Sequence, residues 1–216
     1  MASSYLGTQF AASKLHLADK KPIGMGNRRQ VFAHPENDGL CFKVARFDHI
    51  RAQMDARGFV YRLMPTRRRD DNWLEARAYR QSAIDPANEM IWQNLPRLYG
   101  WQDSDLGVGL VFDYYRAADG SPAPTLRRAI EENGVNRAIQ SALEDLYAYI
   151  RETGLWMRHP NVENTVLAAD GRLKLIDCLG TYNMQAIRHI PALRKRRLEK
   201  HIAYLAKQVA RTAQKA

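Results

Sequence analysis

Two glycines and a lysine in the first quarter of the sequence have the types and spacing that a phosphate-binding site requires. Gly24 and Gly26 stand two residues apart in a turn-rich loop, and Lys43 follows in the apolar segment 40–45. Glycines let backbone amides approach phosphate oxygens closely, and a lysine ammonium can hold the same oxygens. A plain hairpin turn followed by a solvated lysine would explain the same residues.

The neighbouring sequence excludes two kinds of glycine loop. A dinucleotide-binding fingerprint opens a helix, whereas residues 29–33 are predicted as a strand, and a P-loop needs a Gly-Lys-Ser/Thr triplet that is absent. A glycine loop between two strands, followed by a lysine on a third, is the kinase arrangement. That lysine needs a carboxylate to position it. We expect Glu75, on a helix predicted over 70–80, to supply it; a surface glutamate is the alternative.

A second group of polar residues flanks a predicted β-hairpin in the other half of the chain. Strands are predicted over 165–168 and 173–176, joined by Asp170-Gly171; Asn164 precedes the first and Asp177 follows the second. Amide and carboxylate oxygens are the ligands that Mg²⁺ prefers, and nucleotide phosphates can complete its octahedron. The hairpin therefore predicts a magnesium site made by Asn164 and Asp177.

The elements that must position these residues fall into two groups. Strands over 15–17, 29–33, 40–45 and 107–114 and one helix make the first half β-rich. Beyond the Gly/Pro-rich segment 119–124, helices over 135–153 and 191–210 surround the hairpin. We therefore predict an α+β protein with an N-terminal extension (1–18), a β-rich N-lobe (19–116) and a helical C-lobe (117–216).

Composition places the chain among ordinary globular proteins. It has 216 residues, 45% of them apolar, and its net charge is 33 − 23 = +10. The last thirty residues hold nine Lys/Arg and one acid, a charge of +8, so the rest carries only +2 and is not expected to bind nucleic acid on charge alone. Two cysteines exclude a disulfide framework, and the longest apolar runs are far short of a membrane span. We expect a cytoplasmic protein without a secretory signal.

Taken together, several blocks in this order resemble the protein-kinase-like fold, and more closely the bacterial YrbL family, named for the PhoP regulatory network. The likeness covers roughly residues 19–200. The blocks that carry it are Arg28/Arg29 to His34-Pro35, Leu40-Cys-Phe-Lys-Val44, Leu95-Pro-Arg-Leu-Tyr-Gly100, Gly107-Val-Gly-Leu-Val-Phe-Asp113, Asp119-Gly-Ser-Pro122, Asn164 and Asp177-Cys-Leu-Gly180.

The resemblance implies ATP and Mg²⁺ as cofactors. It implies that Phe112 lines the back of an adenine pocket and that the backbone from Asp113 to Tyr115 bonds the adenine. It also shows departures: counting back from Asn164, His159 stands where kinases have the catalytic aspartate, and Asn161 where they have a lysine. A neutral histidine could act as the base. Only 39 residues follow Asp177, without an Ala-Pro-Glu segment, so we expect a truncated C-lobe and no conventional protein substrate.

These observations leave three hypotheses open. The chain could bind ATP and Mg²⁺ as an atypical phosphotransferase or as a catalytically impaired pseudokinase with a regulatory role. It could instead be a non-enzymatic regulatory or interaction module on the same fold. The basic helix around Arg194-Lys-Arg-Arg197 could bind nucleic acid or an anionic surface, or it could simply pack on its own lobe through Leu198, Ile202 and Leu205.

Overall fold

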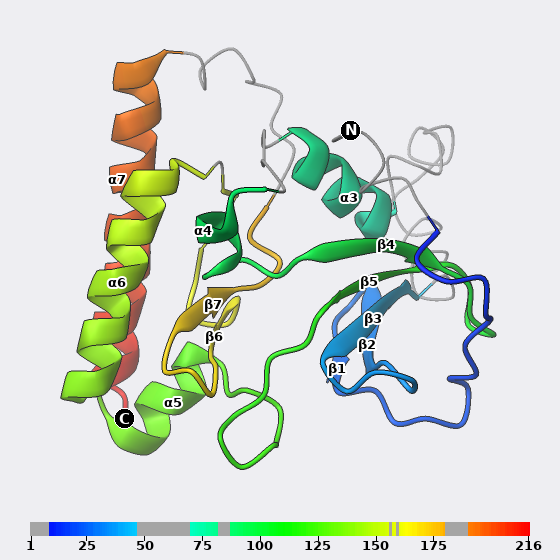
Figure 1. Ribbon diagram of the computed structural model, residues 1–216. Helices are drawn as coiled ribbons and strands as arrows, with labels where there is room; N and C mark the ends of the chain where they lie inside the picture. The colour runs from blue at the N-terminus through cyan, green and yellow to red at the C-terminus, as the bar shows by residue number, and fades with distance from the viewer. Residues whose placement is uncertain (1–8, 47–69, 82–86, 156, 159, 180–189) are drawn as a thin grey trace, which may run out of the picture. The chain divides into compact units, whose positions relative to one another are not determined.

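The computed structural model describes residues 9–46, 70–81, 87–155, 157–158, 160–179 and 190–216 (Figure 1). The chain divides into two compact units, which confirms the expected two-lobed α+β class. The first unit comprises residues 1–81 and 97–114, and the second comprises residues 82–96 and 115–216.

The first unit contains an antiparallel five-stranded sheet in the order β1-β2-β3-β5-β4. Its helix, α3 (Asp71–Gln81), contacts β3 and β5. The strands are β1 (Gly24–Met25), β2 (Arg29–Ala33), β3 (Leu40–Ala45), β4 (Leu98–Gln102) and β5 (Gly109–Asp113). Every residue of β3 is buried, as the central strand of a sheet covered on both faces must be.

Close packing in this sheet requires a glycine at position 109. A Cβ at Gly109 would lie 2.4 Å from the ring of Phe42 and 2.5 Å from the carbonyl oxygen of Lys43. Phe42 is fully buried in the core of the first unit, and its ring fills the space beside the glycine. Gly109 therefore sets how closely β3 and β5 approach each other beside Lys43.

The segment before β1 is held to the sheet by its side chains and by one carboxylate. Residues 15–17 form no strand, contrary to the prediction: only an isolated bridge pairs Leu15 with Ser104. Leu15 and Leu17 are nevertheless buried in the core. Asp105 accepts hydrogen bonds from the backbone N–H groups of Leu17 (2.9 Å) and Ala18 (3.2 Å). Leu15 and Leu17 thus pack into the core as expected, although the segment lacks the regular backbone pairing of a strand.

The second unit consists of four helices and a two-stranded hairpin among its described residues. Its elements are α4 (Glu89–Trp92), α5 (Leu126–Asn133), α6 (Arg137–Thr153), β6 (Thr165–Leu167), β7 (Leu173–Leu175) and α7 (Pro191–Ala213). α6 begins after Asn136, whose side chain accepts from the N–H of Ile139, and ends at Gly154 in the left-handed conformation. The predicted start at Val135 was wrong: Val135 precedes the N-cap and is exposed, because the capping Asn136 ends the extended segment.

The residues between α3 and β4 belong to the second unit. Asn94 donates from its amide to the carbonyl of Leu173 (2.7 Å), and its own carbonyl accepts from the N–H of Leu175 (2.7 Å). The carbonyl of Gln93 accepts from the ammonium of Lys174 (2.7 Å). This segment therefore extends the edge of the hairpin, next to β7.

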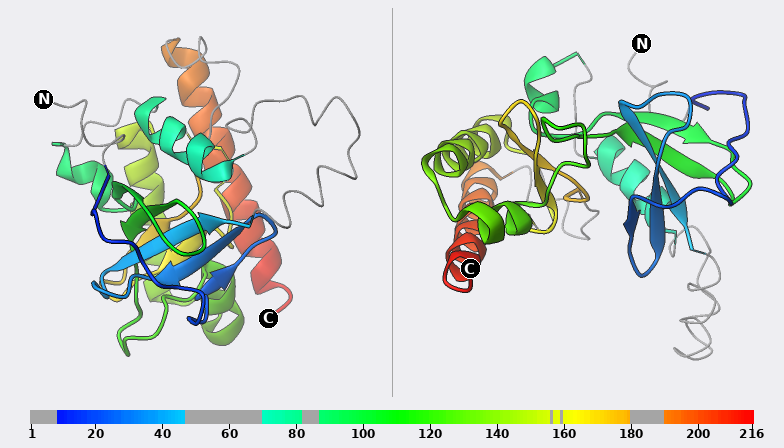
Figure 2. Two further views of the ribbon diagram at one scale, coloured as in Figure 1. Left: turned by 90° about the vertical axis from the view of Figure 1, so that its right-hand side faces the viewer. Right: turned by 90° about the horizontal axis from the view of Figure 1, so that it is seen from below.

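α7 packs on α5 and α6 through its apolar stripe, as its sequence predicts (Figures 1 and 2). Leu198, Ile202, Leu205 and Val209 are buried. None of the helices in the described part of the chain is long and apolar enough to span a membrane.

The anchoring role of Asp105 predicts a pH dependence. The hydrogen bond from Leu17 is the main cause that lowers the pKa of Asp105 below its ordinary value of 3.8. A depressed folded-state pKa adds stability that is complete above the unfolded value and is lost as the pH falls through the folded one. Replacing Asp105 with asparagine should lower the melting temperature at pH 7 and flatten its fall below pH 4.

The matched control is Asp103→Asn, which removes the same charge from an exposed neighbour. Thermal unfolding followed by circular dichroism from pH 3 to 7 measures both variants. Equal melting curves for the two variants would contradict the role given to Asp105.

Candidate functional site

A buried ion pair joins the central strand of the first unit to its helix. The ammonium of Lys43 lies 3.1 Å from Oε1 of Glu75, and the two side chains are 8% and 6% exposed. Lys43 extends from β3 and Glu75 from the second turn of α3. The Lys43 ammonium also lies 4.4 Å from the ring centroid of Phe112 on β5. The structure thus brings together the lysine and the carboxylate that the sequence paired.

Two further side chains complete this cluster, and sequence analysis missed both. Arg29 of β2 bonds Oε2 of Glu75, and its guanidinium lies 3.4 Å from the amide oxygen of Asn72. The Asn72 side chain, fully buried, donates to the carbonyl of Lys43 (3.0 Å). Arg29 stands three residues after Gly26, the position of the third glycine in a GxGxxG loop. The arginine that stands in place of this glycine is the sequence signal that could have indicated a second cation beside Glu75.

The glycine loop is a tight hairpin. Gly24 pairs with Val31 and Met25 with Gln30, and the N–H of Gly26 donates to the carbonyl of Arg29 (2.9 Å). A Cβ at Gly24 or Gly26 would meet only ordinary contacts, at 3.7 and 3.6 Å. Neither glycine is therefore needed for packing. Val31 of β2 pairs with Gly24 of β1 on one side and with Lys43 of β3 on the other. The hairpin therefore places Gly24 level with Lys43 across the sheet, with β2 between them.

The predicted magnesium residues lie at one end of the hairpin in the second unit. Thr165 pairs with Leu175, and the next bond runs from the N–H of Ile176 to the carbonyl of Asn164 (2.8 Å). Asp177 follows directly, exposed and with a positive φ of 51°. Aspartate is among the residue types that tolerate the left-handed region, and such backbones cluster at functional sites. The backbone thus places Asn164 and Asp177 at the same end of β6 and β7.

Asn161 holds the loop before β6. Its side-chain oxygen accepts from the N–H of Glu163 (2.9 Å) and of Asn164 (2.8 Å), and its carbonyl accepts from the hydroxyl of Thr165 (2.9 Å). At the position where the kinase resemblance predicts a lysine, this chain thus has a residue that orients the backbone of Asn164. His159, the predicted base, lies outside the described residues.

The expected adenine-binding backbone divides between the units. Asp113 ends β5 in the first unit, and Tyr115 begins a segment of the second. The Asp113 carboxylate accepts from the N–H of Arg97 (2.7 Å) and the hydroxyl of Tyr99 (2.8 Å). The carbonyl of Tyr115 accepts from the N–H of Ala123 (3.1 Å). The side chain of Asp113 thus holds the start of β4.

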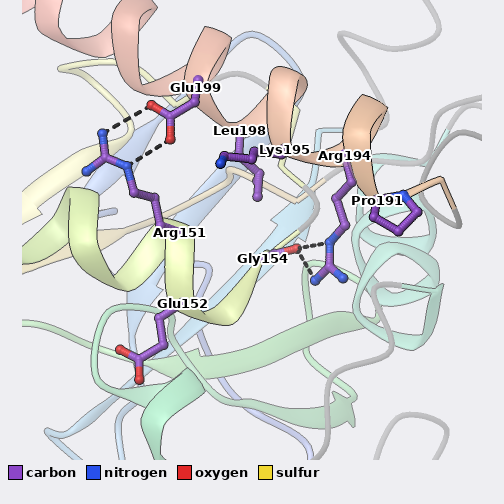
Figure 3. Close-up of a pocket in the computed structure, with 8 residues that line it drawn as sticks. All are labelled: Arg151, Glu152, Gly154, Pro191, Arg194, Lys195, Leu198 and Glu199. Carbon is purple, nitrogen blue, oxygen red and sulfur yellow. Dashed lines mark hydrogen bonds and ion pairs between the residues drawn. The ribbon is translucent and has the colours of Figure 1, made fainter.

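The pocket drawn in Figure 3 contains none of the predicted site residues. It has a volume of about 590 Å³ and lies where α6 ends and α7 begins. Arg194 donates to the carbonyl of Gly154 (2.9 Å), and Arg151 pairs with Glu199 (2.8 Å). Of its charged groups, Arg194 thus satisfies the end of α6, and Arg151 and Glu199 satisfy each other. Among the described residues, no group of three or more His, Cys, Asp or Glu could hold a metal ion.

The buried cluster predicts a large stability effect at Glu75. Glu75→Ala would leave Lys43 and Arg29 in the protein interior without the carboxylate that both bind. Removing one member of a buried pair costs about 3–5 kcal/mol, so chemical denaturation should show a loss of that size.

The control for Glu75→Ala is Glu36→Ala, which removes an exposed carboxylate from the same unit. It should change stability by less than about 0.5 kcal/mol. A similarly small loss in both variants would contradict the structural role of the cluster.

Comparison with known proteins identifies the family of this chain. The chain matches the family model "PhoP regulatory network protein YrbL" over residues 15–210. It is 26% identical over 120 residues to the proteins named "Uncharacterized protein YrbL" from Escherichia coli (strain K12) and Shigella flexneri. Each alignment covers 55% of this chain and 47% of the relative, so the chain matches about half the length of these relatives. The extent of the family match shows that the chain belongs to the YrbL family of PhoP regulatory network proteins.

Proposed function

We propose that this chain binds ATP together with Mg²⁺ in the manner of a kinase-like regulatory protein. The observation that carries the proposal is the buried Lys43–Glu75 pair, 3.1 Å long, between a sheet strand and a helix. Burying two charges costs several kcal/mol per ion, and an apolar pair of similar volume is often as stable. The presence of a buried lysine beside a carboxylate is therefore better explained by the binding of a ligand than by a gain in folding stability.

Each group has a role in this proposal. The absence of side chains at Gly24 and Gly26 lets phosphate approach the backbone of the loop, and Lys43, held by Glu75, contacts the phosphates. Asn164 and Asp177 supply oxygen ligands of the hard type that Mg²⁺ takes. A site of this kind needs only two protein ligands because the phosphates provide others. When bound, the metal would neutralise phosphate charge.

The proposal predicts that Mg²⁺ strengthens ATP binding through Asp177. In isothermal titration, ATP should bind the wild-type chain at least tenfold more tightly with Mg²⁺ than with EDTA, because a charge-assisted contact contributes about 1.5–3 kcal/mol. Asp177→Asn should remove most of that gain, and Lys43→Met should weaken binding under both conditions.

Asp145→Asn is the matched control, since it removes an exposed carboxylate from α6 in the same unit. It should keep the full gain from Mg²⁺. The proposal fails if ATP does not bind, or if Asp177→Asn responds to Mg²⁺ as the wild type does.

Transfer of the γ-phosphate by this chain stays a prediction that rests on His159. A neutral imidazole, with a pKa of about 6.5 in peptides, could accept a hydroxyl proton. If the chain turns ATP over, His159→Ala should abolish turnover and leave the binding of ATP and Mg²⁺ intact. Turnover that survives this substitution would exclude histidine as the base.

A further inference from the structure

The outward face of α7 carries a straight row of cations. Arg196, Lys200, Lys207 and Arg211, which we call the basic stripe, are all exposed. At 3.6 residues per turn they fall within about 60° of one another around the helix, and from first to last they extend over about 22 Å. Among the described residues, none of the four has a hydrogen bond or an ion pair. We propose that the basic stripe binds the phosphate backbone of a double-stranded nucleic acid.

The stripe is available because the rest of α7 is already engaged. Its apolar residues are buried against α5 and α6. Its single acidic residue, Glu199, lies off the stripe and pairs with Arg151 of α6 at 2.8 and 3.1 Å. No carboxylate of α7 therefore opposes the four cations.

The stripe is not the contiguous basic run that the sequence suggested. Within Arg194–Arg197, the guanidinium of Arg194 caps the last carbonyls of α6, at 2.9 Å from Gly154 and 3.3 Å from Thr153. Arg197 is only partly exposed and has contacts of its own. Of this run, only Arg196 belongs to the stripe. The stripe is periodic, with successive members four or seven residues apart.

The chemistry of the stripe favours a nucleic acid over other polyanions. A helix that lies in a membrane surface buries an apolar face in the lipid, and that face of α7 is occupied by its own unit. A protein interface has an apolar core, whereas only Tyr204 (47% exposed) and Leu193 (40% exposed) stand out along α7. Phosphate contacts by Lys and Arg need no such core.

The shape of the stripe favours a duplex over a single strand. Proteins that hold single strands combine a basic groove with several stacking aromatic side chains. The stripe instead lies on the convex surface of one 23-residue helix, with a single aromatic residue beside it. A duplex is stiff and carries one charge per about 1.7 Å, so a straight row of cations can follow it. The hydroxyl of Tyr204 could add a phosphate contact.

Salt dependence tests the proposal. In fluorescence anisotropy with a labelled 20-base-pair DNA duplex, four phosphate contacts predict a slope of about −3.6 in log K against log [salt]. Affinity should fall about 150-fold between 50 and 200 mM salt. Lys200→Glu/Lys207→Glu should weaken binding at least tenfold at 50 mM and reduce the slope to about −1.8.

Lys14→Glu/Lys20→Glu is the matched control, since both lysines are exposed and the net charge falls by the same amount, from +10 to +6. It should weaken binding less than threefold. Equal losses in the two double variants would overturn the proposal, because overall charge alone would then explain binding. It is also overturned if the duplex does not bind, if a single strand of the same length binds more tightly, or if polyglutamate competes as well as unlabelled duplex. Circular dichroism of each variant checks that it is folded.

Discussion

The first unit depends on one buried carboxylate that is shared by two cations. Glu75 receives Lys43 from β3 and Arg29 from β2, so one side chain of α3 is tied to two strands of the sheet. Asn72 adds a bond from the same helix to the backbone of β3. Charges so deeply buried tolerate little movement, because only well-placed partners compensate for the solvation that each charge loses. The position of α3 on the sheet is thus set by polar geometry in addition to apolar packing.

The regular elements could largely be predicted from sequence, because their patterns are local. The strands at 29–33 and 40–45, the hairpin with its Asp-Gly turn, and the apolar stripe of α7 are found where periodicity and turn residues put them. Residues 15–17 form no strand, because a strand needs a distant segment that pairs with it along its length. In this segment only Leu15 has a bridge partner, Ser104. The attachment of residues 87–96 to β7 likewise rests on non-local bonds of Asn94 and Gln93.

The part of the candidate site that could be predicted from sequence is the part that follows from the spacing of its residues. Lys43 and Glu75 could be paired because a strand lysine and a following helix define a simple geometry. Arg29 and Asn161 were missed as structural members of their sites, since their partners are set by the folded backbone. The pairing of Arg194 with the end of α6 shows the same limit: a run of basic residues does not reveal which of them bond to their own unit.

The path of the chain has a consequence for how the protein is made. The polypeptide passes from one unit to the other between residues 81 and 82, between 96 and 97, and between 114 and 115. Asn94 reaches the ribosome's exit long before Leu173 and Leu175, the backbone partners that complete its bonds. The first unit has all its strands once residue 113 is synthesised, whereas residues 87–96 must wait for β7. A cleavage between residues 114 and 115 would leave residues 82–96 of the second unit attached to the first, so no single cleavage separates the two units cleanly.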